Sequence, residues 1–85
     1  MLNAIVLINA EPAKVAALGP RLAALDGVSE VYSVTGDEDL VALLHVDDTE
    51  LIARLVTEEI ATLPGVTATR TLIAFRQYDP ADINF

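Results

Sequence analysis

The segment Val34–Leu40 combines the residue types of this sequence that are best suited to binding a small molecule, a glycine followed by two spaced acids. Strand-like runs flank it at 31–35 and 40–46, so its residues must reverse the chain. Gly36 can take the positive φ that a tight reversal requires, and Asp37 can hydrogen-bond its own backbone. Such a loop also presents backbone N–H groups beside carboxylates. Together these groups suit a ligand that carries both an anion and an ammonium group, such as an amino acid.

The same residues also have a purely structural interpretation. Asp37 and Asp39 are typical of turns and of soluble surfaces, and Gly36 serves the backbone in either case. Glu38 lies between the two acids, and we expect it to point the other way, into solvent. Turn formation and ligand binding therefore both remain open for this loop.

Few residues could support catalysis or bind a metal. His45 is the single histidine, the chain contains no cysteine, and Ser29 and Ser33 have no base beside them in the sequence. The acids at 37–39 do not follow the pattern of a calcium-binding loop. We therefore predict no metal, no cofactor and no catalytic residue, and we expect that the protein is not an enzyme.

Composition indicates one small domain that does not bind nucleic acid. The chain has 85 residues, of which 53% are hydrophobic, against about 45–50% in an average soluble domain. The net charge is -8, and the five basic residues are scattered, so contact with a phosphate backbone is not expected. No apolar run reaches the roughly 18 residues of a membrane span, and no signal peptide is recognisable. Because cysteine is absent as well, we expect a complete cytoplasmic protein that contacts neither nucleic acid nor membrane.

A repeated motif predicts the fold. Leu25-Asp26-Gly27-Val28 closes one helical pattern, and Leu63-Pro64-Gly65-Val66 closes another. A strand-like run precedes each pattern, so the sequence contains two copies of strand, helix, turn and strand. This order predicts a ferredoxin-like β-α-β-β-α-β domain of the α+β class, with an antiparallel sheet.

Two local sequence features bear on the expected helices, a proline in the first and an N-cap in the second. Gly19-Pro20 interrupts the apolar stripe of the first helix, where proline removes a backbone donor, so we expect a distortion there. Asp47 or Asp48 can cap the second helix, and Asp47 with Glu50 has the spacing of a capping box.

The end of the chain differs from the rest in composition. An alternating pattern from 66 to 77 predicts the last strand, and the residues after it are polar and contain proline. We therefore assign the ligand-binding domain to residues 1–78 and a loose C-terminal tail to residues 79–85.

The central strands indicate self-association. The runs 2–8 and 40–46 are apolar at nearly every position, so neither face of the sheet centre is suited to water. Helices can cover only one of these faces in this fold. A second copy that packs its sheet against the other face would produce a barrel-like homodimer.

Two motifs match known signatures. The run Val31–Leu40 resembles the strand–loop–strand signature of the effector-binding domain of leucine-responsive and asparagine regulators, the Lrp/AsnC family. Leu63-Pro64-Gly65-Val66-x-x-Thr69-x-Thr71 is similar to that family's second signature. The resemblance covers residues 2 to 77. It implies a dimeric α/β barrel formed through the sheets, and rings of dimers that bind amino-acid effectors at the interfaces between dimers.

The resemblance also implies site residues. The matching positions are loop residues and last-strand threonines: Thr35, Gly36, Asp37, Asp39, Thr69 and Thr71. One of the two acids is expected to pair with the ammonium group of the effector through a charge-assisted bond. Without the resemblance, the threonines are explained by the preference of β-branched residues for strands.

One departure from the family pattern bears on function. Most members carry an N-terminal helix-turn-helix DNA-binding domain, whereas this sequence begins directly at its first strand. The resemblance therefore implies a stand-alone, non-catalytic, amino-acid-binding oligomer that modulates transcriptional regulation or amino-acid metabolism without binding DNA itself. Full-length Lrp/AsnC regulators are the partners that this interpretation suggests.

Other interpretations stay open at this point. A dimeric α/β-barrel enzyme, similar to cofactor-free monooxygenases or isomerases, would have to use His45, Tyr32 or Arg70. A purely structural oligomerisation module would need no ligand. An ACT-type amino-acid-binding module is disfavoured, because its binding glycine usually follows the first strand, where this chain has Asn9-Ala10-Glu11-Pro12.

Overall fold

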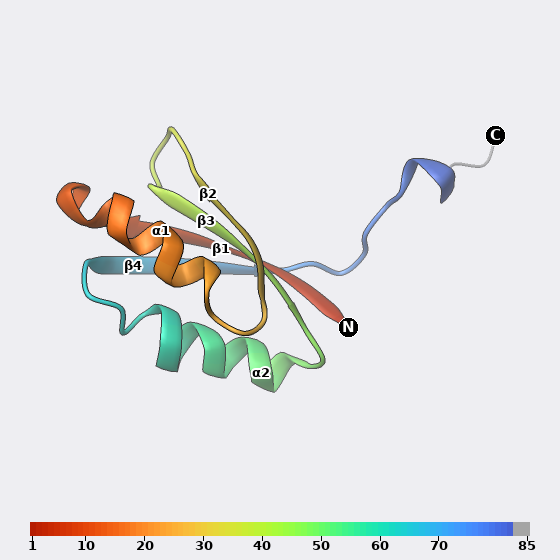
Figure 1. Ribbon diagram of the computed structural model, residues 1–85. Helices are drawn as coiled ribbons and strands as arrows, with labels where there is room; N and C mark the ends of the chain where they lie inside the picture. The colour runs from red at the N-terminus through yellow and green to blue at the C-terminus, as the bar shows by residue number, and fades with distance from the viewer. Residues whose placement is uncertain (83–85) are drawn as a thin grey trace.

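The computed structural model describes residues 1–82, which form a four-stranded antiparallel sheet with two helices (Figure 1). The strands lie side by side in the order β2-β3-β1-β4, each antiparallel to its neighbours. The predicted ferredoxin-like α+β class is confirmed. The bounds of the elements are β1 (Leu2–Ala10), α1 (Val15–Ala23), β2 (Val28–Ser33), β3 (Leu40–Val46), α2 (Thr49–Arg54) and β4 (Val66–Ile73).

The two halves of the predicted repeat fold alike. Each half begins on a central strand, β1 or β3, and returns through a helix to an edge strand, β2 or β4. Gly27 and Gly65 follow the two helical segments with φ angles of 96° and 101°. A Cβ atom at Gly27 would lie 2.8 Å from Cγ1 of Val46. Backbone conformation and close packing therefore both require glycine there.

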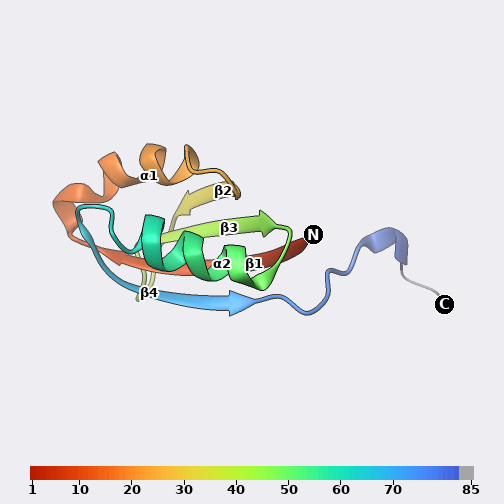
Figure 2. The ribbon, with the colours of Figure 1, turned by 90° about the horizontal axis from the view of Figure 1, so that it is seen from below.

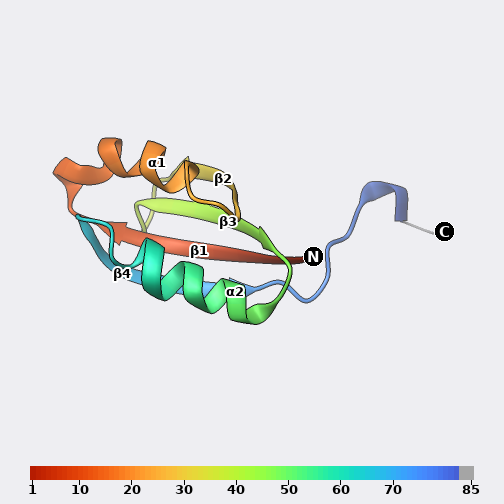
Figure 3. The same cartoon turned by 60° about the horizontal axis from the view of Figure 1, so that its bottom comes forward.

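The hydrophobic core lies between the sheet and the helices, which cover one face (Figure 2 and Figure 3). Alternate residues of the central strands face this layer and are buried, including Val6 and Ile8 of β1 and Leu44 of β3. The helices contribute the remaining buried side chains: Leu18, Leu22, Ile52, Leu55, Val56 and Ile60.

Among residues 1–82 no helix covers the opposite face of the sheet, and we refer to this face as the open face. Its central side chains are Ile5 and Leu7 of β1 with Val41 and Leu43 of β3, which are only partly buried. At the edges of the same face, the larger side chains of Tyr32 and Leu72 are exposed, with 52% and 46% of their surface accessible. The expectation that helices shield only one of two apolar faces is therefore met by the described residues.

The second helix begins at a different residue from the one its capping-box spacing favours. The side chain of Asp48, and not that of Asp47, accepts a hydrogen bond from the backbone N–H of Leu51 at 2.9 Å. Asp48 is therefore the N-cap, which moves Glu50 out of the capping-box position. The helix continues after Arg54 as a π-helical segment, η2 (Leu55–Ile60).

The first helix continues through its proline. A 3₁₀ turn at Pro12–Lys14 leads into α1, which stays helical on both sides of Pro20. Proline removes the N–H that would bond to the carbonyl of Ala16. Because Ala16 and Pro20 are both exposed, water can replace that bond. The irregular backbone lies in the second helix instead.

The last strand is shorter than its alternating pattern predicts. β4 ends at Ile73, after which Ala74 donates one more backbone hydrogen bond to Asn3 at the start of β1. Beyond Asn3, β1 has almost no chain left to pair with. Residues 75–82 leave the sheet as an arm that ends in a 3₁₀ turn at Pro80–Asp82 (Figure 1). The remainder of the predicted tail, residues 83–85, lies outside the described residues.

Candidate functional site

The loop of residues 34–39 connects the edge strand β2 to the central strand β3, and backbone hydrogen bonds hold both of its ends. The N–H of Val34 donates to the carbonyl of Asp39 at 3.1 Å, and the N–H of Asp39 donates to the carbonyl of Ile8 at 2.9 Å. Gly36 has a φ of 131°, which confirms the left-handed turn expected there. The loop is thus tied to the end of β1 as well as to its own strands.

Asp39 helps to hold the loop in place. Its carboxylate oxygen Oδ2 accepts a hydrogen bond from the backbone N–H of Ala10 at 2.8 Å, and the residue is partly buried. This bond satisfies a backbone donor near the bulge where β1 and β4 change register. One of the two candidate acids therefore has a structural partner within the chain.

Asn9 provides a second tie. Its side-chain Nδ2 donates to the backbone carbonyl of Asp37 at 2.7 Å. Asn9 follows Ile5 and Leu7 by alternation on the open face, so this bond draws the tip of the loop toward that face.

Glu38 forms an ion pair, in contrast to the expectation that it is simply solvated. Its Oε1 lies 2.8 Å from Nη2 of Arg70 on β4, and the exposed fractions of the two side chains are 22% and 65%. Arg70 pairs with Leu7 across the strands, so it lies on the open face. The loop therefore reaches across the end of β1 to β4, and its apparent spacer residue makes the contact.

Asp37 is the acid of the loop that stays available. It is exposed, and among residues 1–82 its carboxylate has neither a hydrogen bond nor an ion pair. Thr35 is exposed on the same loop. Of the two acids singled out by the sequence, Asp37 is therefore the one free to meet an incoming cation.

The last-strand threonines lie on the other face of the sheet. Thr69 and Thr71 pair with Ile8 and Val6, which are fully buried under the helices. Both threonines are partly buried there. Within one chain the structure gathers Thr35, Gly36, Asp37 and Asp39 in one loop, whereas Arg70, between the threonines, is the β4 residue that reaches this loop.

Two contacts of this site were not predicted from the sequence. Arg70 and Glu38 are 32 positions apart, and Asn9 is 28 positions from Asp37, with no shared motif. Only the strand order brings them together, because β1 lies between β3 and β4. Strand alternation in the sequence separates Arg70 from the threonines, but it does not indicate which loop Arg70 meets.

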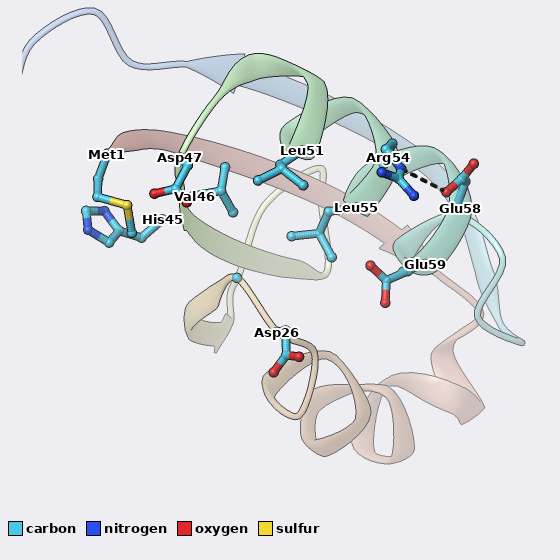
Figure 4. A pocket seen from close by; sticks show the side chains of 11 residues that line it. Met1, Asp26, His45, Val46, Asp47, Leu51, Arg54, Leu55, Glu58 and Glu59 are labelled. Atoms are coloured by element: carbon cyan, nitrogen blue, oxygen red, sulfur yellow. Dashed lines mark ion pairs between the residues drawn. The ribbon is translucent and has the colours of Figure 1, made fainter.

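A second feature is a hollow at the opposite end of the sheet (Figure 4). Its volume is about 520 Å³, and it lies between α2 and the turn that follows α1. Arg54 and Glu58 form an ion pair of 3.7 Å at its side, with both side chains well exposed. The hollow is lined by apolar side chains, Val46, Leu51 and Leu55, and by acidic ones, Asp26, Asp47, Glu58 and Glu59.

His45 lines this hollow, but its ring has a partner within the sheet. Its Nδ1 lies 2.6 Å from Oδ1 of Asn3 on the neighbouring strand. In the described part of the chain, no three histidine, aspartate or glutamate side chains gather as a metal-binding group. None of the helices in residues 1–82 is both long and apolar enough to cross a membrane.

The sequence matches one protein family over most of its length. Residues 3–82 match the model of the Lrp/AsnC ligand binding domain. The chain belongs to this family. The resemblance carried by Val31–Leu40 and Leu63–Thr71 is thereby confirmed.

Known relatives of this Lrp/AsnC domain include regulators and solved structures. An uncharacterised HTH-type transcriptional regulator of Pyrococcus abyssi is 36% identical over 70 residues, which are 82% of this chain and 44% of that protein. This chain thus spans about half the length of the curated relatives it matches. The crystal structure of TTHA0845 from Thermus thermophilus is 49% identical with a TM-score of 0.88, covering 93% of this chain and 99% of that one.

A third relative was solved with a small molecule. The feast or famine regulatory protein of M. tuberculosis, complexed with L-methionine, is 27% identical with a TM-score of 0.76, covering 99% of this chain and 56% of that one. The curated relatives are named as transcriptional regulators and not as enzymes.

Proposed function

We propose that this protein is a non-catalytic sensor that binds an amino acid and modulates transcriptional regulation or amino-acid metabolism. The observation that carries the proposal is the match of residues 3–82 to the Lrp/AsnC ligand binding domain. The methionine complex of the M. tuberculosis relative supports an amino acid as the class of ligand. The net charge of -8 supports action without direct DNA binding, through partners such as full-length Lrp/AsnC regulators in the cytoplasm.

The effector binds at the loop of residues 34–39. Gly36 shapes the turn, Asp39 holds it against β1, and Asp37 receives the ammonium group of the effector. Thr35 lies beside these residues, and Thr69 and Thr71 take part where a neighbouring subunit completes the site. Asp39 is assigned the structural role because its carboxylate already accepts a hydrogen bond from Ala10. Asp37 is assigned the binding role because its exposed carboxylate has no partner within residues 1–82.

Assembly occurs through the open face. Two copies pack this face together as a homodimer, and dimers associate into a ring whose interfaces contain the effector loops. The partly exposed apolar side chains at the centre of the open face and the exposed Tyr32 and Leu72 at its edges support this arrangement. An uncovered apolar face of this kind is unusual for a monomer.

Calorimetric titration of the purified protein with each of the common L-amino acids tests the proposed function. At least one is expected to bind, and at a hundredfold excess over its Kd it should stabilise the fold by about 2.7 kcal/mol in thermal unfolding. The variant Asp37→Asn should weaken binding roughly tenfold or more, because it removes a charge-assisted bond.

Asp47→Asn is the matched control. Asp47 is also exposed, but it follows β3 at the other end of the sheet and lines the hollow shown in Figure 4. It should leave the affinity unchanged. Loss of binding in Asp47→Asn alone would move the site to the hollow, and binding of no amino acid by the wild-type protein would leave a purely structural module.

A further inference from the structure

We propose that Arg70 is the residue that recognises the carboxylate of the effector, so that Asp37 and Arg70 together select a zwitterion. This inference rests on the proposed function of the loop. It concerns a residue of β4 on the open face, which no loop motif includes.

Arg70 lies beside the loop of residues 34–39. Its guanidinium lies against the effector loop, held by Glu38 at 2.8 Å, and Glu38 directly follows Asp37. In the part of the chain that the structure describes, no other basic side chain bonds to this loop. The loop contains three acids, so Arg70 is its single source of positive side-chain charge for an anionic group.

Arg70 keeps N–H donors for a ligand within the part of the chain that the structure describes. A guanidinium has five N–H donors in a planar fork, and that fork matches a carboxylate. Within residues 1–82 of a single subunit only Nη2 has a partner, the carboxylate of Glu38, and 65% of the side chain is exposed before any second copy packs on the open face. A ligand carboxylate can therefore bind to Arg70 while Glu38 keeps the guanidinium in place.

Asp37 and Arg70 carry opposite charges. Asp37 offers a carboxylate with no partner among residues 1–82, whereas Asp39 and Glu38 are already bonded to Ala10 and Arg70. A ligand that carries only an ammonium group leaves the remaining N–H groups of Arg70 unused, and a ligand that carries only a carboxylate leaves Asp37 unused. A molecule with both an ammonium and a carboxylate group satisfies both side chains.

The test compares the tightest-binding L-amino acid with its primary amide, which keeps the ammonium group and lacks the carboxylate. Wild-type protein should bind the acid roughly tenfold or more tightly than the amide, as expected for a hydrogen bond between charged groups. Arg70→Gln should bring the two affinities together by weakening the acid. Arg70→Lys keeps the charge without the fork and should give an intermediate ratio.

Arg54→Gln is the matched control, because Arg54 is the other arginine in an exposed ion pair with a glutamate. It should leave the ratio of acid to amide unchanged. An unchanged ratio in Arg70→Gln, or equal binding of acid and amide by the wild-type protein, would overturn the role of Arg70 while the proposed function stands. If the wild-type protein bound no amino acid, the proposed function itself would fail.

Discussion

The two faces of the sheet are similar in residue type but differ in what covers them. Along β1, Val6 and Ile8 point to the helices and are completely buried, whereas Ile5 and Leu7 point to the open face and are only partly buried. The same alternation runs through β3. Apolar side chains on both faces are typical of a sheet covered on both sides, which supports the homodimer proposed above.

The candidate site lies at the margin of the open face. The loop of residues 34–39 is tied to the open face by Asn9 and by the ion pair of Glu38 with Arg70, whereas within residues 1–82 no hydrogen bond or ion pair joins it to the helices. An apolar centre with polar groups at its margin is the usual anatomy of a protein interface. A ligand that changes the loop would therefore act at the border of the surface proposed for assembly.

The largest expected effect is a difference in the free energy of unfolding between substitutions on the two faces. Ile8→Ala removes a fully buried side chain beneath the helices and should lower the free energy of unfolding by about 2–5 kcal/mol. Leu7→Ala, the neighbouring residue on the open face, should cost less when the protein is dilute enough to be monomeric. Urea unfolding followed by circular dichroism measures both variants, and equal losses would remove the distinction between the faces.

The second expected effect is a change in oligomeric mass when a charge is placed on the open face but not when it is placed on α2. Leu43→Asp places a charge at the centre of the open face and should convert a homodimer into a monomer of 9.1 kDa, as measured by light scattering after size-exclusion chromatography. Leu51→Asp is the matched control, because Leu51 is 39% exposed on α2, away from the open face. It should keep the mass of the wild type. If Leu43→Asp also kept that mass, the open face would not be the interface.

The sequence was sufficient to predict the layout of the fold. The two glycine turns at Gly27 and Gly65 gave the repeat, and the apolar runs gave the central strands, because both signals are local. The sequence motif did not identify the N-cap of α2 among two neighbouring aspartates. Asp48 caps α2 although Asp47 has the better motif, because Asp48 has the extended backbone of an N-cap and its side chain accepts the hydrogen bond of the Leu51 N–H.

The candidate site was predictable only in part. The turn at Gly36 follows from local chemistry, and the membership of the loop in a known signature singled out Asp37 and Asp39. The roles of Glu38 and Arg70 depend on how the loop lies across the end of β1, which strand order decides and spacing does not. Long-range ion pairs of this kind leave no periodic pattern in a single sequence.

A smaller effect concerns the attachment of the loop. Asp39→Asn weakens the bond that the carboxylate accepts from the N–H of Ala10, and the loss should be about 1 kcal/mol, because the site is partly exposed. The amide of Ala10 should also exchange faster with deuterium in nuclear magnetic resonance spectra. Asp37→Asn is the control and should change neither quantity. Equal exchange in both variants would indicate that Asp39 does not anchor the loop.

The smallest expected effect is a titration on the open face. Tyr32 donates a hydrogen bond to Glu30 at 3.0 Å, and this bond, with the negative charge of Glu30, raises the pKa of the Tyr32 phenol above its ordinary value. Folding thus favours the protonated phenol. The associated stabilisation is present below the unfolded pKa of about 10 and is lost as the pH rises through the folded value.

Ultraviolet absorbance of the phenolate measures this pKa, in a Tyr78→Phe background that leaves Tyr32 as the one tyrosine. Glu30→Gln should lower the pKa toward its ordinary value. If a second copy covers the open face, the phenol is also withdrawn from water at concentrations where the protein is dimeric, which disfavours the phenolate further. The pKa of Tyr32 should then be higher in the dimer than in the monomeric Leu43→Asp variant. The same pKa in both would place Tyr32 outside the interface and confine the covered part of the open face to the central strands.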